Sequence, residues 1–499
     1  MPMHTATAAL ETLTELLDSI ESSAAILRLS LEEQLLQIRT NVLNSNTKEE
    51  GMASAPDLPF HISASLASHA SKVRVAAEKL AQLVTPPRHI VFEAAGSFYI
   101  TAALDIIVKS DIASVIHDKG TRDAKKVGIP VEVLAQETRL DSDLLARLLR
   151  HLVANGIFEE ITVNKFANNA ASQTLVHDPE FRAHLDLVMH EGRAAIAFFP
   201  ELISKRFENT ASAASLSGTP ATTTHPLPPS AFSLYSHGQR FYDWLHSPEH
   251  SDRNTNFNVA MRGMALTEGL AFLPADYPFY ALPPSRLIVD VGGGLGSLPA
   301  LLLPSLQAQD LTHTFIVQDL EPVIRQATLA LKHSMDPISI NTENMAIDME
   351  HWMAQGRIQF CIQDCFQLQP PELEGSTFIL KNMIHNYPDS QALCILLNLR
   401  KSHPYKLLII DRLVLPQLKS EASNMTCSDE LLMSLGVPDF QPSQRAPTFY
   451  DLVMASLHGG KNRTVHDWCK LLASAGFQLE QIWYLRASTG QAVIECTCV

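Results

Sequence analysis

The sequence predicts an α/β protein with an open, mainly parallel sheet that ends in an antiparallel hairpin, preceded by a mostly helical region. Three observations support this prediction. From residue 287 onward, short apolar runs alternate with helical patterns, as they do in a parallel sheet. The last two runs are joined by the short turn 487–490, so they form a hairpin. Residues 60–170 are mostly helical and contain two short helices followed by a small hairpin.

The composition is that of an ordinary globular protein. Of the 499 residues, 46% are hydrophobic and 18% are charged. The net charge of −15 argues against nucleic acid as a partner, because phosphate binding needs a basic surface. The seven cysteines all lie from Cys361 onward and complete no metal-ligand pattern, so we expect reduced thiols, no metal and a cytoplasmic location. The N-terminus lacks the pattern of a signal peptide, and no run approaches the roughly 18 apolar residues of a membrane span.

Residues 1–58 are predicted to be a helix followed by a linker. Apolar residues recur at spacings of three and four through 5–43, at Leu10, Leu13, Leu17, Ile20, Ala24, Leu27 and Leu31. This seam suits packing on the helix's own domain or against a second subunit. Residues 44–58 are polar and contain Gly51 and Pro56, which is typical of a linker.

Residues 59–207 are predicted to contain a winged helix. One short helix begins within 129–135, a second helix spans 144–154 after the capping residue Asp141, and a hairpin spans 157–167. A winged helix often reads DNA, but here the second helix offers few positive side chains and the chain is acidic. We therefore expect this unit to serve packing or dimerisation. The positive side chains of the second helix are Arg147, Arg150 and His151.

Residues 208–230 are rich in Ser, Thr, Ala and Pro and are predicted to be a surface insertion. They precede the stretch 232–264, in which aromatic residues and methionines are dense. Such a stretch is typical of a core, and it also suits the wall of a pocket for a flat apolar ligand. Phe257 and Met261 are our candidates for contact with that ligand.

The strands of the main sheet are predicted from apolar, β-branched runs bounded by turn residues. They span 287–291, 314–318, 358–362, 376–380, 407–411, 479–485 and 491–496.

The first strand of the sheet leads into the glycine cluster 292–296. Glycines allow a sharp turn and a close approach of the backbone to a ligand. Asp319 lies 23 residues after Gly296, at the position where a carboxylate can accept hydrogen bonds from ribose hydroxyls. Ser297 takes the place of a third glycine, and Asp290 precedes the turn. These details and the final hairpin favour S-adenosylmethionine over a dinucleotide.

Five motifs occur along the chain in a fixed order. They are Asp290-Val-Gly-Gly-Gly-x-Gly, Val317-Gln-Asp-Leu, Gln363-Asp-Cys-Phe, Lys381-x-x-x-His385 and Gly459-Gly-Lys-x-Arg463-Thr464. The series resembles that of S-adenosylmethionine-dependent O-methyltransferases of the caffeic acid O-methyltransferase type, especially their fungal secondary-metabolite branch. The resemblance covers about residues 75–499. It implies a class I methyltransferase, Rossmann-like fold within 231–499, a winged-helix dimerisation domain before it, and a homodimer.

The resemblance also implies site residues. It assigns S-adenosylmethionine to Asp290, Gly292, Gly294, Gly296, Asp319, Leu320, Asp364, Cys365 and Lys381. It makes His385 the general base that removes the proton of an acceptor hydroxyl, and Met454 part of the acceptor pocket. A phenol with a pKa of about 10 is a poor nucleophile at neutral pH, so a base is needed. An acid should orient the histidine, and Asp411 at the end of its strand is the candidate, although Arg412 could face the histidine instead.

The chain departs from the family pattern at two places. His385-Asn386-Tyr387 stands where His-Asp-Trp is usual, and Asn462 stands where the family often has a second acid. An asparagine can hydrogen-bond but cannot stabilise a histidinium by charge. The main hypothesis is thus an O-methyltransferase acting on a hydroxyl, expected to be phenolic, of an aromatic natural product. The alternatives are a relative that binds the cofactor but catalyses cyclisation, dehydration or a pericyclic step, and a non-catalytic dimeric scaffold.

Overall fold

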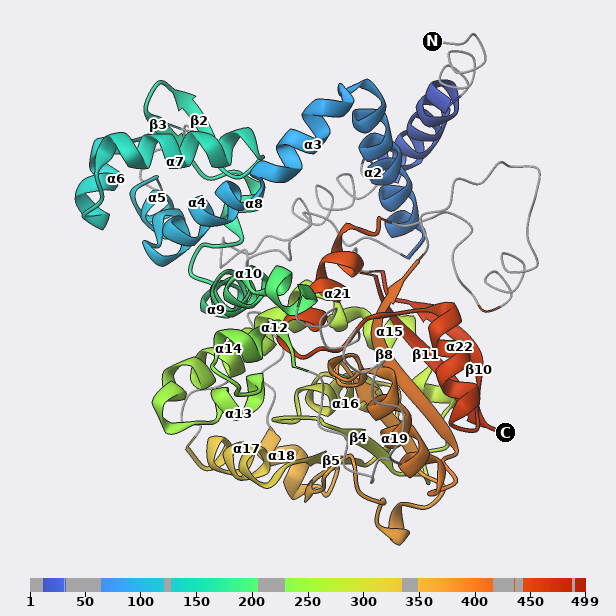
Figure 1. Ribbon diagram of the computed structural model, residues 1–499. Coiled ribbons are helices and arrows are strands. Elements are labelled where there is room, and N and C mark those ends of the chain that lie inside the picture. Colours follow the sequence, from blue (N-terminus) through green and yellow to red (C-terminus); the bar gives the residue numbers. More distant parts are fainter. Residues whose placement is uncertain are drawn as a thin grey trace, which may run out of the picture.

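The computed structural model describes residues 12–30, 32, 64–120, 127–204, 229–333, 349–415, 435, 443–486 and 490–499. The predicted linker and most of the predicted insertion lie outside this set. Figure 1 shows the N-terminal helices with a small sheet at one end of the molecule and the large sheet at the other, with a middle layer of helices between them.

The N-terminal end contains the elements predicted for the winged helix. Its helices are α2 (Ala64–Val84), α3 (Pro87–Gly96), α4 (Phe98–Lys109), α5 (Ile112–Gly120), α6 (Val131–Thr138) and α7 (Ser142–Ala154), and its sheet contains β1 (Ile129–Pro130), β2 (Glu159–Thr162) and β3 (Lys165–Ala167) in the order β1-β3-β2. The Asp141 side chain caps α7 by accepting a hydrogen bond from Leu144 N at 2.8 Å, as predicted. Arg150 of α7 binds Glu160 of the hairpin at 3.0 Å, so its charge is used within the fold.

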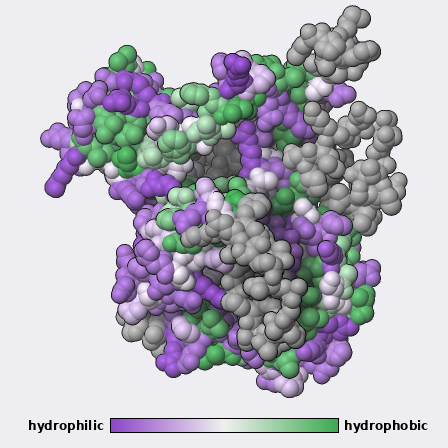
Figure 2. Space-filling model, viewed as in Figure 1, coloured by the Kyte–Doolittle hydropathy of each residue, from purple (hydrophilic) through white to green (hydrophobic). Residues whose placement is uncertain are grey.

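Helix α3 has no buried residue. Val91 and Phe92 are 71% and 78% exposed, and Phe98 and Tyr99 at the start of α4 are 58% and 61% exposed. Figure 2 shows apolar surface along this end of the molecule. By length and composition the stretch Pro87–Lys109 could cross a membrane, contrary to the expectation from the sequence that no run is long enough. Helix α4 nevertheless buries residues in the domain core, and its Asp105 pairs with Lys109, which favours a face that another protein covers.

The middle layer joins the two ends. Helix α8 (Ala170–Gln173) lies beside the small hairpin and leads into this layer. The layer is built from α9 (Pro179–Leu187), the π-helical turn Val188–Gly192, α10 (Arg193–Ala197), α12 (Ala231–Tyr235), α13 (Phe241–Leu245), the 3₁₀ turn Pro248–His250 and α14 (Ser251–Thr267). Helices α9 and α14 pack so closely that only glycine fits at residue 263. A Cβ on Gly263 would lie 2.2 Å from the Glu180 carbonyl oxygen. Arg253 of α14 fixes this pair by donating to Glu191 at 2.6 Å and to Asp186 at 2.7 Å.

The large sheet has the strand order β10-β11-β8-β7-β4-β5-β6, with β9 paired to β8. Its strands are β4 (Ile288–Val291), β5 (Phe315–Asp319), β6 (Ile358–Ile362), β7 (Thr377–Lys381), β8 (Lys406–Val414), β9 (Arg463–Thr464), β10 (Phe477–Tyr484) and β11 (Gln491–Cys498). Strands β4 to β8 are parallel, and β11 joins β8 in an antiparallel pair, so the predicted sheet and hairpin are confirmed. The short strand β9 was not predicted.

Apolar side chains cover both faces of this sheet. The helices around it are α15 (Leu273–Asp276), α16 (Ser297–Ala308), α17 (Glu321–His333), α18 (Met349–Ala354), α19 (Asp389–Arg400), α21 (Arg445–Leu457) and α22 (Val465–Ser474). Leu396 of α19 and Trp468 of α22 are buried in the core of one face, and Leu303 of α16 and Trp352 of α18 in that of the other. The carboxyl ends of the parallel strands meet at one edge, which is where such sheets bind ligands.

Candidate functional site

Strand β4 ends in a glycine loop, residues 292–296. Gly292, Gly294 and Gly296 have φ of +70°, +59° and +81°, which residues with side chains rarely adopt. A Cβ on Gly293 would lie 2.5 Å from Oδ2 of Asp290. The loop therefore lies directly over the end of the sheet and exposes backbone where a ligand can approach.

Asp319, the last residue of β5, faces this loop. Its Oδ2 accepts a hydrogen bond from Gly294 N at 2.9 Å, and its Oδ1 accepts one from Leu320 N at 2.8 Å. Burial raises the pKa of the Asp319 carboxyl, and the two backbone bonds act against that rise. A carboxylate beside the glycine loop has the placement expected of a ribose acceptor.

Asp290 lies beneath the glycine loop. It is 1% exposed, and neither carboxyl oxygen has a hydrogen-bond partner within the described part of the chain. Burial raises the pKa of Asp290 to about 7, while the charge of Lys381 at the end of β7 acts in the opposite direction. A buried carboxyl without a partner is unfavourable unless a ligand supplies a donor or a positive charge. Asp290 therefore fits a cationic ligand bound on the loop.

The segment after β6 supplies the residues predicted to flank an adenine ring. Strand β6 pairs with β5, so Asp364 follows at the same edge as Asp319. Asp364 Oδ1 accepts a hydrogen bond from Phe366 N at 2.9 Å, which forms a local turn. Burial raises the pKa of the Cys365 thiol to about 12, so Cys365 presents a neutral thiol. Leu320 is half exposed beyond the end of β5.

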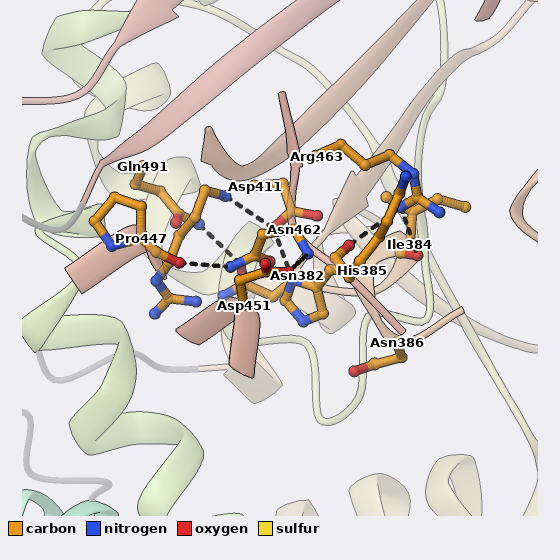
Figure 3. Close-up of polar contacts among 12 residues, drawn as sticks. Asn382, Ile384, His385, Asn386, Asp411, Pro447, Asp451, Asn462, Arg463 and Gln491 are labelled. Atoms are coloured by element: carbon orange, nitrogen blue, oxygen red, sulfur yellow. Dashed lines mark hydrogen bonds and ion pairs between the residues drawn. The ribbon is translucent and has the colours of Figure 1, made fainter. Parts of the chain in front are cut away.

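His385 lies on the 3₁₀ turn Ile384–Asn386, directly after β7. Its Nδ1–H donates to Oδ1 of Asp411 at 2.6 Å, and both side chains are buried (Figure 3). Asp411 stands on β8, the neighbour of β7, so adjacent strands bring the two residues together. The same carboxylate oxygen accepts a hydrogen bond from Arg412 N at 2.8 Å. Of the two residues that the sequence left open, Asp411 is the one that faces His385.

The Gly-Gly-Lys-x-Arg motif fixes the backbone around His385. Lys461 N donates to the His385 carbonyl at 3.0 Å, and a Cβ on Gly460 would lie 2.0 Å from that oxygen. Arg463 is completely buried and donates to the carbonyls of Ile384 at 3.3 Å and Tyr387 at 2.9 Å. These carbonyls lie on either side of His385, so the motif acts by holding the histidine in place.

Asn462, predicted to stand in for a second acid, is buried next to α21. Its backbone N donates to Oδ1 of Asp451 at 2.8 Å, and its side-chain amide donates to the carbonyl of Pro447 at 3.4 Å. Its Oδ1 has no partner among the described residues. Neither bond reaches His385, so a catalytic role for Asn462 stays a prediction without a direct contact to support it.

A group of neutral polar side chains that the sequence did not predict lies around the turn that carries His385. The Asn386 amide donates to the Tyr242 hydroxyl of α13 at 3.3 Å. The Tyr242 ring stacks on the ring of His458, with centroids 5.0 Å apart and planes at 26°. Burial, and next the charge of His385, lowers the pKa of His458 to about 3. The available signals were the aromatic stretch that holds Tyr242 and the place of His458 directly before the Gly-Gly pair.

The predicted acceptor-pocket residues adjoin this group. Phe257 of α14 meets the Tyr242 ring edge-on, with centroids 6.1 Å apart. Met454 of α21 is buried and lies one turn before His458, whose N donates to the Met454 carbonyl at 3.0 Å. Phe257 and Met261 pack on the buried cluster formed by α13 and its neighbours. Phe257 and Met454 thus both adjoin the Tyr242–His458 stack, and their role with Met261 in binding a flat ligand stays a prediction.

A buried ion pair lies behind Asp411 and was also missed. The Arg412 guanidinium pairs with Glu268 and lies 3.4 Å from the centroid of the Tyr450 ring. Glu268 also accepts a hydrogen bond from Asn382 at 2.7 Å. Glu268 and Arg412 are 144 residues apart, and no motif links them. With both charges matched, the pair can anchor the end of β8 that carries Asp411.

Within the described residues, no group of three or more His, Cys, Asp or Glu side chains is placed to hold a metal ion. The six described cysteines are free.

Comparison with known proteins identifies the family. Residues 235–478 match the model of the O-methyltransferase domain. The O-methyltransferase gedA of Aspergillus terreus is 26% identical over 456 residues, which cover 83% of this chain and 84% of that protein. Two solved structures share the fold, at TM-scores of 0.55 and 0.58. One is the mitomycin 7-O-methyltransferase MmcR, at 19% identity over 85% of this chain and 99% of its own. The other is described as a pericyclic reaction enzyme, at 19% identity over 86% and 94% of the two chains.

The domain match, the fungal relatives and the motif series agree with one another. The cofactor of this family is S-adenosylmethionine, and the glycine loop with Asp319 and the unpaired Asp290 carboxyl fits it. The chain therefore belongs to the S-adenosylmethionine-dependent O-methyltransferases of the caffeic acid type, among those of secondary metabolism.

Proposed function

We propose that this protein methylates a phenolic hydroxyl of an aromatic natural product, with His385 as the general base. The observation that carries the proposal is the buried His385–Asp411 pair, joined by a 2.6 Å hydrogen bond. His385 follows β7, which is the neighbour of the strand that leads into the glycine loop, and Asp411 stands on β8, the next strand of the sheet. Asp319 would bind the ribose of the cofactor, and the segment of Asp364 and Cys365 would flank its adenine.

When bound, S-adenosylmethionine would supply a methyl group on a positively charged sulfur, which an acceptor oxygen can attack with S-adenosylhomocysteine as the leaving group. His385 Nδ1 is held by Asp411, which leaves Nε2 to take the proton of the acceptor hydroxyl. The negative charge of Asp411 stabilises the resulting histidinium. Gly460 and Arg463 fix the backbone of His385, so the contribution of this chain is to position the base and align the oxygen with the methyl group.

The test is an assay of the purified protein with methyl-labelled S-adenosylmethionine and a panel of phenols and aromatic polyketides. We expect label in an O-methyl product together with S-adenosylhomocysteine. Conversion of an acceptor while the cofactor stays intact would instead favour a cyclisation, dehydration or pericyclic step. Asn386 and Asn462 motivate that alternative, whereas the intact His385–Asp411 pair favours methyl transfer.

The pKa of Asp290 predicts a pH dependence of cofactor binding. Its carboxyl, with a pKa raised to about 7, is mostly protonated below that pH, and a cationic ligand binds the carboxylate form better. We expect the affinity for S-adenosylmethionine to rise with pH up to about 7 and then to level off, with uptake of the ligand releasing a proton. Calorimetry in buffers of different ionisation enthalpy measures this release.

The matched control is Asp290→Asn, which has the same shape and cannot ionise. Titration of the ligand's own amine is common to both proteins, so their difference isolates Asp290. An identical pH dependence in the variant would contradict the role given to this carboxyl.

We also propose that the exposed face of α3 and α4 is where two copies of the chain meet. The motivating observation is the exposure of Val91, Phe92, Phe98 and Tyr99 on neighbouring turns. The double variant Val91→Asp/Phe92→Asp should be a monomer by analytical ultracentrifugation, because charges in an apolar interface are unfavourable. Val163→Asp, at the 81% exposed tip of the small hairpin, is the control and should remain a dimer. A monomeric wild type, or a dimeric double variant, would refute this placement.

A further inference from the structure

Glu268 lies directly after α14 and is completely buried. Its two carboxylate oxygens bind different segments of the large sheet. One oxygen pairs with the Arg412 guanidinium, and the other accepts a hydrogen bond from the Asn382 side-chain amide at 2.7 Å. Arg412 follows Asp411 on β8. Asn382 follows β7 and precedes His385 by three residues. One carboxylate therefore touches both of the segments that carry the pair of His385 and Asp411.

The bond to Asn382 fixes the turn that leads to His385. Asn382 has φ of +52°, a left-handed conformation that residues with side chains rarely adopt and that asparagine adopts more readily than most. Its amide is held at both ends, because Nδ2 donates to Glu268 and Oδ1 accepts a hydrogen bond from the Gln491 side chain at 2.8 Å (Figure 3). The backbone leaves β7 at this residue, so these two bonds set the direction in which the chain continues to His385.

The bond to Arg412 acts on Asp411 from the other face of the sheet. Side chains alternate along β8, so Asp411 and Arg412 point to opposite faces. The backbone N–H of Arg412 donates to Asp411 Oδ1 at 2.8 Å, and the same oxygen accepts the hydrogen bond from His385. Because Glu268 holds the Arg412 side chain, it also holds one of the two donors that orient this carboxylate.

The Arg412 side chain is itself confined. Its guanidinium lies 3.4 Å from the centroid of the Tyr450 ring, and the Tyr450 hydroxyl lies 3.1 Å from Nε2 of His184 on α9. Burial lowers the pKa of His184 to about 4, so His184 is neutral at physiological pH and adds no second charge. Removal of the Glu268 charge would leave the buried Arg412 cation without its partner, which is strongly unfavourable and would force the side chain to move.

We propose that Glu268 is a positioning residue for the general base, and that its one carboxylate sets both the placement of His385 and the orientation of Asp411. This inference rests on the proposed function, because it takes His385 as the base of methyl transfer. Glu268 extends from the end of α14, the helix that also carries Phe257 and Met261. Its carboxylate thus links the helix predicted to line the acceptor pocket to the base.

The test follows the proton between His385 and Asp411 by one-dimensional proton NMR of the protein loaded with S-adenosylhomocysteine. A short hydrogen bond from an imidazole to a carboxylate moves its proton resonance far downfield of the amide region. We expect such a resonance in the wild type and its loss in His385→Ala, which assigns it. Glu268→Gln keeps the shape of the side chain and removes its charge, and should shift the resonance upfield or abolish it. The control Glu191→Gln removes another buried carboxylate that pairs with an arginine, Arg253, and should keep the resonance.

The same variants are compared in methyl transfer and in cofactor binding. Glu268→Gln should lower kcat about 10- to 100-fold, because a misplacement of about 1 Å at the reacting groups can cost about 100-fold. The Kd for S-adenosylmethionine should stay nearly unchanged, which also shows that the variant is folded. In the His385→Ala background, Glu268→Gln should have almost no further effect on kcat, because the group on which Glu268 acts is already gone. Glu191→Gln should leave kcat and Kd nearly unchanged.

Asn382→Gly is a second variant that does not disturb a buried charge. It removes the side-chain bond to Glu268, and glycine adopts the positive φ without a steric cost, so the variant should fold and show the same changes to a smaller extent. A wild-type resonance and kcat in Asn382→Gly would overturn the inference. It would also be overturned if Glu268→Gln kept the resonance, lowered kcat no more than Glu191→Gln, or lowered kcat equally with and without His385.

The NMR measurement needs no turnover and therefore separates the two proposals. A resonance that depends on Glu268, in a protein that forms no methylated product, would leave the placement of His385 by Glu268 standing and refute the proposed function. Methyl transfer by a wild type whose resonance is unchanged in Glu268→Gln would do the reverse.

Discussion

His385→Ala is expected to lower kcat for methyl transfer by about 10³-fold while the affinity for S-adenosylmethionine stays unchanged. A positioned general base contributes roughly 10² to 10⁴ in rate, and a phenol cannot lose its proton to water at a comparable rate. His385 is buried and forms a 2.6 Å hydrogen bond to Asp411, and no other described side chain is positioned to replace it as the partner of Asp411. The measurement is kcat at saturating cofactor, together with calorimetric titration of the cofactor.

Asp411→Asn is the companion variant. It keeps the shape of the side chain and removes the charge that orients His385 and stabilises the histidinium. We expect a loss of kcat of about 10²-fold, smaller than that of His385→Ala, because the imidazole is still present. If His385→Ala transferred methyl groups as fast as the wild type, the base would lie elsewhere and the proposed mechanism would be wrong.

The strands of the large sheet could be predicted because each is a short apolar run, and buried strands need such runs. The Asp141 cap and the small hairpin were predictable for a similar reason, because their local chemistry determines the turn. Strand β9 could not be predicted in this way. Arg463 and Thr464 pair with β8 because Arg463 is fixed by the carbonyls around His385, which is a tertiary cause.

The residues of the candidate site likewise fall into those with a local sequence signal and those placed by tertiary contacts. The glycine loop and Asp319 carry a local signal, since a positive φ needs glycine and the second strand ends in an acid. Whether the Asp411 side chain points toward His385 depends on the register between β7 and β8. A shift of one residue would turn the side chain to the other face of the sheet. The stack of Tyr242 on His458 joins segments more than 200 residues apart, and no spacing in the sequence encodes it. Contacts made by the fold therefore complete a site of which motifs mark only the cofactor half and the base.

Asp319→Ala is expected to give the opposite kinetic signature to His385→Ala. A hydrogen bond to a charged group contributes about 1.5 to 3 kcal/mol, and the carboxylate would serve the ribose hydroxyls while it braces Gly294, so we expect the Kd for S-adenosylmethionine to rise about 100-fold. At saturating cofactor kcat should stay within a few fold of wild type, because the base and its support are untouched. Asp319→Asn keeps one acceptor oxygen and should raise the Kd by only about tenfold. Arg325→Ala, a change at an exposed side chain of the following helix α17, is the control and should leave the Kd nearly unchanged. A Kd in Asp319→Ala equal to that of the wild type would mean that the ribose is bound elsewhere, and the cofactor would then have to be placed anew relative to His385.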